Sequence, residues 1–368
     1  MKITTIEFYE ARLALKEPFV TALGAREYSD HLFVRIFADN GLFGWGECTP
    51  SLAINGETVG TCLALAPLLS KALIGKSPEA HSQIFEQMNQ VIYGNTSLKS
   101  AIDIACYDLA SKAAGMPLYK YLGATVQKKI YTDYTVSIGE ISNMVAAARK
   151  IKKNGFPIIK VKLGKDGNKD VARIKAIRKA VGKELKIRID ANQGWEIPEA
   201  IDTLKKLAPY NIEYCEEPIN RHLSHRLNAL KSQSPIAIMA DESLCNHFDA
   251  QMLATEKHCD AFNIKLGKSG GLFEAQRILT IADRHTLPVQ VGGFVESKIV
   301  FTANCHLAHT SEWVRYFDCD SPLFHRKDPI VGGMQYLKDG EIKLPERPGL
   351  GLVVEDQFLR SCKSLVIN

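Results

Sequence analysis

Residues 185–218, LKIRIDANQGWEIPEAIDTLKKLAPYNIEYCEEP, contain the pattern that decides the fold. A short apolar strand ends at Asp190, an amphipathic helix follows, and a second apolar strand ends at Glu216. The spacing continues on both sides, because ionisable residues follow one another at intervals of 28, 26, 25 and 24 residues, at Lys162, Asp190, Glu216, Asp241 and Lys265. One strand–helix unit has about this length, and the carboxyl ends of barrel strands open onto one face. Three carboxylates between two lysines on that face indicate a divalent metal flanked by bases, which suits removing and returning a proton next to a carboxylate.

The repeat extends over eight short apolar strands, with amphipathic helical stretches between them. The strands are expected near residues 130–137, 157–163, 185–190, 212–216, 236–240, 260–265, 287–292 and 313–317. Strict β–α alternation predicts an α/β fold with a parallel (β/α)7β-type TIM barrel. The alternative is a doubly wound sheet, but such a sheet places its ligand groups mainly at one switch point, and here polar residues close five consecutive strands.

The residues before the barrel show strands followed by helices in place of β–α alternation, which predicts an α+β capping domain over residues 1–125. Strands are expected at 3–8 and 31–37, and the turn signal Asn40-Gly41 joins the second to residues 42–46 as a hairpin. Helices are expected at about 57–74, 78–92 and 98–114. The barrel domain is assigned to residues 126–320. The loop-rich segment 321–368 is expected to pack back on the capping domain.

Composition excludes several classes of protein. The chain has 368 residues, enough for two domains, and a net charge of +5 without a Lys/Arg block, so we expect no nucleic-acid partner. Nine scattered cysteines without a C-x-x-C pair are typical of reduced thiols in a cytosolic protein. No window approaches 18 uninterrupted apolar residues, so no membrane span is expected. The oligomeric state stays open, with a homo-oligomer as one option.

Two lysines close the second strand of the barrel. Alternate strand residues point inward, so Lys160 and Lys162 should both face the barrel interior. Buried lysines are rare unless they are paired or functional. Two neighbouring ammonium groups near a metal are expected to lower each other's pKa, as a lysine base requires. The alternative is an ordinary solvated strand end.

Three carboxylates close the next three strands. A single carboxylate at a strand end is usually a helix N-cap, but three on consecutive strands make that interpretation hard to sustain for Asp190, Glu216 and Asp241. Oxygen ligands without His or Cys favour Mg²⁺ or Mn²⁺ over Zn²⁺. In each of the adjacent pairs Glu216-Glu217 and Asp241-Glu242, one residue must point away from the barrel axis or reach in to support the other.

The sixth strand ends in Asn263-Ile264-Lys265-Leu266-Gly267-Lys268. Lys265 is in step with the carboxylates, and Lys268 lies in the following loop. Gly270-Gly271 before a helix could bind a phosphate, but such glycines more often only shape the turn.

These motifs resemble the enolase superfamily, in its muconate-lactonising-enzyme subgroup, over nearly the whole chain. The resemblance rests on the capping domain, K-x-K, D-x-N, E-x-P, D-E-S and K-x-x-K-x-G-G. It implies that Asp190, Glu216 and Asp241 are ligands of one Mg²⁺, with Mn²⁺ as a substitute. It also implies that Lys162 and Lys265 are acid/base groups on opposite faces of a substrate, assisted by Lys160.

Within this subgroup the chain is most similar to the dipeptide epimerases. Asp318-Cys319-Asp320 follows the eighth strand, where that family binds the free ammonium of a dipeptide, and two carboxylates suit a cation. The alternative is a polar loop after a strand. The runs Thr132–Ser137, which contains Thr135, and Asp190–Trp195 are also similar.

One departure concerns the substrate side chain. Family members that act on Ala-Glu carry an arginine after Thr-Ala-Leu, whereas here Thr21-Ala22-Leu23 precedes Gly24. An uncharged or apolar C-terminal residue is therefore expected, unless Arg26 replaces the missing arginine. The candidate lining of the pocket is apolar and consists of Phe19, Leu23, Ile54 and Phe294.

The resemblance implies a Mg²⁺-dependent dipeptide epimerase that inverts the α-carbon of the C-terminal residue by 1,1-proton transfer through an enediolate. Two other interpretations stay open. One is a cycloisomerase or o-succinylbenzoate synthase of the same subgroup, against which Asp318 and Asp320 argue because those substrates carry no ammonium. The other is a metal-stabilised binding protein without catalysis, against which both retained lysines argue.

Overall fold

The computed structural model describes residues 1–124, 126 and 128–368. Eight strands form one parallel sheet in the order β12-β11-β10-β9-β8-β7-β6-β5. Their bounds are β5 Tyr134–Val136, β6 Ile158–Lys162, β7 Lys186–Asp190, β8 Ile212–Glu216, β9 Ile238–Ala240, β10 Ala261–Lys265, β11 Val289–Gly292 and β12 Val314–Phe317. The sheet curls until its edges meet, where the backbone N–H of Asp133 donates to the carbonyl of Phe317 at 3.2 Å. The predicted (β/α)7β barrel is confirmed.

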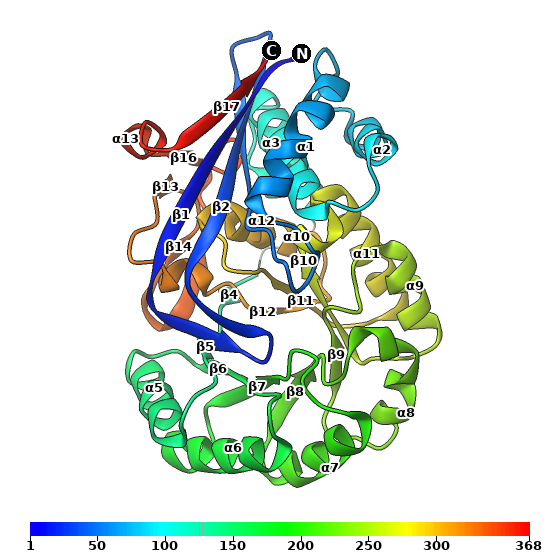
Figure 1. The fold of residues 1–368 in the computed structure, drawn as a ribbon, viewed down its shortest axis with the longest axis vertical. Helices are drawn as coiled ribbons and strands as arrows, with labels where there is room; N and C mark the ends of the chain where they lie inside the picture. Colours follow the sequence, from blue (N-terminus) through cyan, green and yellow to red (C-terminus); the bar gives the residue numbers. More distant parts are fainter. Residues whose placement is uncertain (125, 127) are drawn as a thin grey trace.

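Helices cover the outside of this barrel (Figure 1). They are α5 Ile141–Lys153, α6 Gly167–Val181, α7 Ile197–Leu207, α8 Leu227–Lys231, α9 His247–Thr255, α10 Leu266–Ser269, α11 Leu272–His285 and α12 Lys298–Ala308. Their apolar faces and the outward strand residues form one buried cluster, which includes Ile159, Ile187 and Ile189. Many inward residues of the strands are polar, whereas Tyr214, Met239 and Ala261 form a separate small buried cluster. No helix among the described residues combines the length and apolar character of a membrane span.

A four-stranded antiparallel sheet caps the barrel in the order β17-β1-β2-β3. Its strands are β1 Ile3–Thr21, β2 Gly24–Ala38, β3 Phe43–Cys48 and β17 Lys363–Ile367, and it packs with α1 Val59–Leu73, α2 His81–Val91 and α3 Thr96–Ala113. Gly44 and Gly46 allow β3 to lie directly on α3, because a Cβ at either position would overlap the carbonyl oxygen of Ala105 or Ala101. The predicted β2–β3 hairpin and three helices are confirmed.

The first two strands are far longer than the sequence indicated. Instead of ending near residue 8, β1 continues to Thr21 and pairs with β2 from Gly24 onward. This hairpin reaches down from the cap to β5 (Figure 1). Its tip is attached there by a hydrogen bond of 3.0 Å from the Ile138 N–H to the Val20 carbonyl. The hairpin therefore brings residues 19–26 over the open end of the barrel.

The predicted strand 130–137 is divided in two. β4 (Ile130–Tyr131) leaves the barrel and pairs with β15 (Glu341–Lys343), which pairs with β14 (Gln335–Tyr336). The remaining elements of the C-terminal segment are β13 Ile330–Gly332, β16 Leu352–Val354 and α13 Asp356–Leu359, and a short α4 spans Leu118–Tyr121. The segment after residue 320 thus contacts both the cap and the barrel. The domain boundaries stay predictions, and Thr125 at the first of them lies outside the described residues.

Buried side chains link the cap to the barrel. Glu47 on β3 accepts hydrogen bonds from the N–H and the hydroxyl of Ser297, at 2.9 and 2.6 Å, at the start of α12. Asp103 on α3 accepts from the Leu272 N–H at 2.5 Å, at the start of α11. A carboxylate at each helix N-terminus satisfies free N–H groups and favours the helix dipole. These contacts fix the cap over the strand ends.

Candidate active site at the carboxyl ends of the barrel strands

Three buried carboxylates lie together where β7, β8 and β9 end. Oxygens of Asp190, Glu216 and Asp241 all lie within 4.8 Å of one another. Asp190 is paired in register with Glu216, and Asp241 follows the last residue of β9. All three side chains are fully buried. A set of carboxylate oxygens alone, without sulfur or imidazole, fits a hard divalent cation such as Mg²⁺.

Two lysines approach this cluster from opposite sides of the barrel. Lys162 ends β6 and Lys265 ends β10, four strands apart in the eight-stranded sheet. The Lys162 ammonium lies 2.6 Å from Asp190, and the Lys265 ammonium lies 2.6 Å from Asp241. Both lysines also line the pocket above the cluster. A small molecule bound over the carboxylates would therefore have one ammonium or amine on each side.

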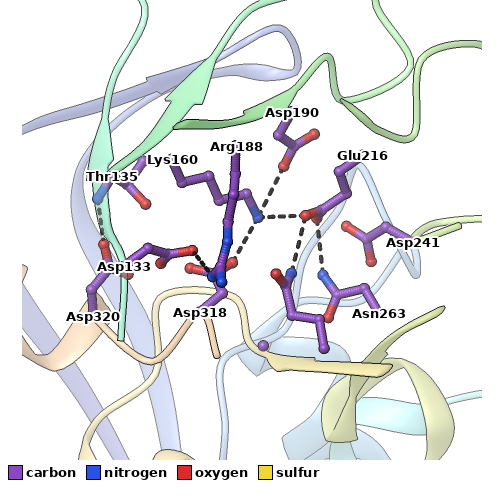
Figure 2. A network of polar contacts seen from close by, with 12 residues as sticks. Asp133, Thr135, Lys160, Arg188, Asp190, Glu216, Asp241, Asn263, Asp318 and Asp320 are labelled. Carbon is purple, nitrogen blue, oxygen red and sulfur yellow. Dashed lines mark hydrogen bonds and ion pairs between the residues drawn. The ribbon is translucent and has the colours of Figure 1, made fainter. Parts of the chain in front are cut away.

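Lys160 lies deeper in the barrel than Lys162. Its ammonium lies 2.7 Å from Glu216, 2.7 Å from Asp318 and 3.4 Å from Asp190 (Figure 2). Burial by itself would lower the pKa of Lys160, but these three carboxylates together raise it well above its usual range. The pKa of Lys160 is thus raised and not lowered as expected, and its ammonium bridges the two acidic groups of the site. The pKa of Lys265 is raised in the same way, because Asp241 and Glu216 outweigh the effect of burial.

Glu217 and Glu242 accept hydrogen bonds from residues in or next to the carboxylate cluster of Asp190, Glu216 and Asp241. Glu217 accepts hydrogen bonds from the Asp241 N–H at 2.7 Å and from the Ser243 hydroxyl, so it organises the loop after β9. Burial raises the pKa of Glu217 to about 7. Glu242 accepts a hydrogen bond from the Asn192 amide at 3.3 Å. Burial raises the pKa of Glu242 well above the usual range, and repulsion from the Asp241 carboxylate raises it further.

Two amides that the sequence analysis did not assign hold Glu216 in place. Asn263 donates to one carboxylate oxygen at 2.9 Å, and Gln290 donates to the other at 3.0 Å. Both oxygens of Glu216 are thus oriented toward defined partners. Strand parity could have indicated these residues, because Asn263 precedes Lys265 by two positions on β10 and so faces the interior with it.

Protein carboxylates occupy the groups after β10 that a phosphate would need. Lys268 contacts Asp241, 2.6 Å from its carboxylate, and the N-terminus of α11 already binds the Asp103 carboxylate. A Cβ at Gly271 would overlap this carboxylate. Gly271 therefore allows the approach of Asp103, and the interpretation as a turn-shaping glycine is the better one.

A second acidic group consists of Asp318 and Asp320, after β12, together with Asp133. Their oxygens lie within 4.8 Å of one another, and all three are buried. Asp318 pairs with Lys160 at 2.7 Å, and Asp320 accepts a hydrogen bond of 2.6 Å from the Thr135 N–H. Figure 2 shows these residues on the side of Lys160 away from Asp241.

The sequence analysis missed Asp133 and its partner Arg188. The Arg188 guanidinium donates to Asp133 at 2.8 Å inside the barrel. Arg188 precedes Asp190 by two positions on β7 and so shares its inward direction. Burial raises the pKa of Asp320 well above its usual range, and repulsion from Asp318 and Asp133 adds to this. Asp318 is different: burial opposes its ionisation, but Lys160, Lys162 and Lys265 lower its pKa to about 2.

The predicted substrate residues line one pocket above both acidic groups. It is bounded by the predicted residues Phe19, Leu23, Gly24, Arg26, Ile54, Thr135, Lys162, Lys265, Phe294, Asp318 and Asp320. The three predicted metal ligands and Lys160 lie beneath this lining. The structure therefore brings the predicted site residues together, and it adds Ser51, Asn192 and Phe324 to the wall.

Arg26 and Gly24 lie on the hairpin that covers the pocket. Arg26 faces Phe19 across the hairpin and donates to the Ser51 hydroxyl at 3.1 Å. Burial lowers the pKa of Arg26, although Glu296 partly opposes this. Gly24 has φ +139°, a conformation that L side chains rarely adopt. An arginine at position 24 would therefore require a different turn, not only a longer side chain.

Comparison with known proteins shows to which family this architecture belongs. A capped (β/α)7β barrel with carboxylates and lysines at its strand ends defines a class of barrel enzymes with their chemistry on that face. The family model "Mandelate racemase / muconate lactonizing enzyme, N-terminal domain" matches residues 3–123, and "Enolase C-terminal domain-like" matches residues 143–358. The chain belongs to the enolase superfamily, in the branch of the mandelate racemase and muconate lactonizing enzymes.

Curated relatives point to one group in this branch. The chain is 46% identical to a D-Ala-D/L-Ala epimerase of Cytophaga hutchinsonii over 368 residues, 100% of both chains. It is 36% identical to an L-Ala-D/L-Glu epimerase of Bacillus subtilis over 357 residues, 96% of this chain and 97% of the relative. It is also 36% identical to a hydrophobic dipeptide epimerase of Enterococcus faecalis over 353 residues, 96% of this chain and 99% of the relative.

Solved structures agree with these relatives. A dipeptide epimerase from Cytophaga hutchinsonii, complexed with Mg and the dipeptide D-Ala-L-Val, superposes with a TM-score of 0.99 at 46% identity and full coverage of both chains. The resemblance found in the sequence is confirmed.

Proposed function

We propose that this protein is a Mg²⁺-dependent dipeptide epimerase that inverts the α-carbon of the C-terminal residue. The observation that carries this proposal is the position of Lys162 and Lys265 on opposite sides of the carboxylate cluster, with Asp318 and Asp320 beside it. A base on one side of a carbon and an acid on the other allow a proton to leave one face and a proton to be delivered to the opposite face. The nearby acidic pair supplies a place for the free amino terminus.

The carboxylate cluster fits the metal. Asp190, Glu216 and Asp241 would hold Mg²⁺, with Mn²⁺ as a substitute. When bound, the ion supplies positive charge that stabilises the negative charge developing on the substrate carboxylate. Asn263 and Gln290 keep Glu216 oriented for this role.

The two lysines exchange one proton each in a turnover. One lysine, as the free amine, removes the α-proton; the C–H electron pair moves into the carboxylate and an enediolate results. The other lysine, as the ammonium, delivers its proton to the opposite face of the same carbon. The pair then has the reverse protonation, ready for the reverse reaction. Lys160 stays charged, and contributes positive charge close to the substrate carboxylate.

Asp318 and Asp320 would bind the ammonium of the dipeptide by charge-assisted hydrogen bonds. The hairpin tip would cover the C-terminal side chain and exclude water. We propose a small or apolar C-terminal residue, because Gly24 replaces the arginine of the Ala-Glu epimerases and the adjoining wall includes Phe19, Ile54 and Phe294. This ammonium site also favours an epimerase over a cycloisomerase or o-succinylbenzoate synthase. The cytosolic location and the oligomeric state stay predictions.

The test is a dipeptide library incubated with the protein and Mg²⁺ in D₂O, scored by the mass gained from deuterium. We expect uptake at the C-terminal α-carbon of dipeptides with a free amino group. Lys162→Ala/Lys265→Ala is the matched control, which removes both bases and should abolish exchange. Absence of deuterium uptake across the library would contradict the proposed function and favour a binding protein.

A further inference from the structure

A second cavity lies directly behind the candidate active-site pocket. It is enclosed by the tip of β1 (Pro18–Val20), by β5 and by helix α5. Figure 1 shows these three elements side by side at the edge of the barrel. The side chains of Phe19, Thr135 and Phe324 line both spaces. The two cavities are therefore neighbours that share one wall.

The shared wall is made of aromatic rings. Phe19 and Phe324 stack with their ring centroids 5.4 Å apart and an interplanar angle of 28°. Tyr134 packs its ring edgewise against Phe324, with 5.5 Å between centroids. Dispersion and apolar burial hold such a ring pair, so a smaller side chain at one position leaves an opening.

The amino end of the proposed dipeptide would lie beside this wall. Asp320 is bonded to the Thr135 N–H at 2.6 Å, and Phe324 lies four residues after Asp320, at the end of a short 3₁₀ helix. The α-carbon of the N-terminal residue is one bond from its ammonium. If Asp318 and Asp320 bind that ammonium, the side chain on this carbon starts close to Thr135, where the two cavities meet.

The second cavity has the chemistry of an apolar side-chain site. Val20, Val136, Ile138, Met144 and Ile151 contribute to its wall. Three charged residues also line it: Lys150 and Glu17 are 3.9 Å apart and largely exposed, and the exposed Lys16 donates to the Leu323 carbonyl at 2.8 Å, so all three belong to the solvent side. A phenyl or branched aliphatic group would bury apolar surface here, whereas a charged side chain would lose hydration without a buried partner.

We propose that this second cavity is a latent subsite for a large apolar side chain on the N-terminal residue of the dipeptide, closed by the Phe19–Phe324 ring pair. The closed wall restricts the protein to small N-terminal residues such as alanine. This inference rests on the proposed function and deepens it, because it assigns a second specificity determinant, Phe324, at the amino end of the substrate.

The test compares kcat/KM for L-Phe-L-Ala and L-Ala-L-Ala. The unmutated protein should prefer L-Ala-L-Ala. Phe324→Ala should raise the ratio for L-Phe-L-Ala over L-Ala-L-Ala about tenfold or more, since a phenyl group gains a preformed apolar site. Phe324→Leu keeps more of the wall and should raise the same ratio by a smaller factor. It replaces Phe324→Ala in the test if thermal unfolding shows that the alanine variant is unstable. L-Ala-L-Phe, the reversed dipeptide, should gain little.

A refilling variant separates use of the cavity from general loosening. Ala147 on α5 lines the second cavity but not the first. Phe324→Ala/Ala147→Phe should return the ratio to its unmutated value, and Ala147→Phe alone should leave the ratio unchanged. Any of three results would overturn the inference. Phe324→Ala could change kcat/KM equally for both dipeptides, or its gain for L-Phe-L-Ala could persist when Ala147→Phe is added. The unmutated protein could also use both dipeptides equally well. In those cases L-Ala-L-Ala is still epimerised, whereas its failure to exchange at all would overturn the proposed function together with this inference.

Discussion

Acetylating the amino group of the dipeptide tests the ammonium site most directly. N-acetyl-L-Ala-L-Ala keeps the C-terminal residue that would react but has no positive charge at its other end. Asp320 is 1% exposed, so its carboxylate would have little water to replace the lost cation. Asp318 already pairs with Lys160 at 2.7 Å, which makes Asp320 the group that most needs the ammonium. Losing a hydrogen bond to a charged group costs about 1.5–3 kcal/mol. This corresponds to a loss of roughly 10–150-fold in kcat/KM.

Asp320→Asn is the variant that isolates this effect. Its amide oxygen can still accept the hydrogen bond from the Thr135 N–H, but its charge is gone. We expect kcat/KM for free L-Ala-L-Ala to fall by a similar factor, while the value for the acetylated dipeptide changes little. The penalty of acetylation should therefore be much smaller in Asp320→Asn than in the unmutated protein. Deuterium incorporation from D₂O measures all four combinations in one assay.

The pH dependence provides a second readout of the same group. Burial and repulsion from Asp318 and Asp133 raise the pKa of Asp320, so a proton occupies this carboxylate at pH values where an exposed aspartate is ionised. The KM for L-Ala-L-Ala should fall as pH rises, until the substrate ammonium itself loses its proton, and Asp320→Asn should flatten this trend. An acetylation penalty below about twofold, or one of equal size in both proteins, would refute an ammonium site at Asp318 and Asp320.

Four further predictions concern the metal, the bases, the side chain and acid stability. Asp241→Asn should weaken Mg²⁺ binding in isothermal titration calorimetry and nearly abolish turnover; full activity after exhaustive chelation would contradict a metal site. Lys265→Ala should stop epimerisation while Lys162 still exchanges the α-proton of one epimer, and an unchanged rate would show that the assignment is wrong. L-Ala-L-Val should be preferred over L-Ala-L-Glu by about tenfold or more; the opposite preference, lost in Arg26→Met, would show that Arg26 replaces the missing arginine. Burial lowers the pKa of His81 from 6.5 to about 4. Between these pH values the histidine is protonated in the unfolded chain but neutral in the folded protein, so the free energy of unfolding should fall as the pH drops from 6.5 to 4. His81→Phe should show a smaller decrease in Tm over this range, whatever its Tm at pH 8.

The barrel could be predicted because its information is local. Each strand–helix unit occupies its own stretch of sequence, and parallel strands end on one face, so Lys162, Asp190 and Lys265 followed from spacing alone. Strand parity extends this further, since Arg188 lies two positions before Asp190 and could have been assigned to the interior by the same rule.

The hairpin and the aromatic wall could not be predicted in this way. Residues 14–18 of β1 read Ala-Leu-Lys-Glu-Pro, which carries weak strand preference. Only Ala14 among them pairs with β2, and Leu15 instead forms a bridge to His325, so distant contacts decide the path of this stretch. Phe324 meets Phe19 only because the chain returns after the eighth barrel strand to a hairpin that begins near the first residue. Contacts of such long sequence separation leave no periodic signal in either segment.

The pairing of β17 with β1 has a consequence for how the protein is made. Ile6 pairs with Ile367, so the outer strand of the cap sheet comes from residues synthesised after the whole barrel. On the ribosome, β1, β2 and β3 can pair early, but their sheet must wait with one edge open until residues 363–367 emerge. An open edge is a template for pairing with other chains. Until then the unpaired edge of β1 is open to pairing with a neighbouring chain.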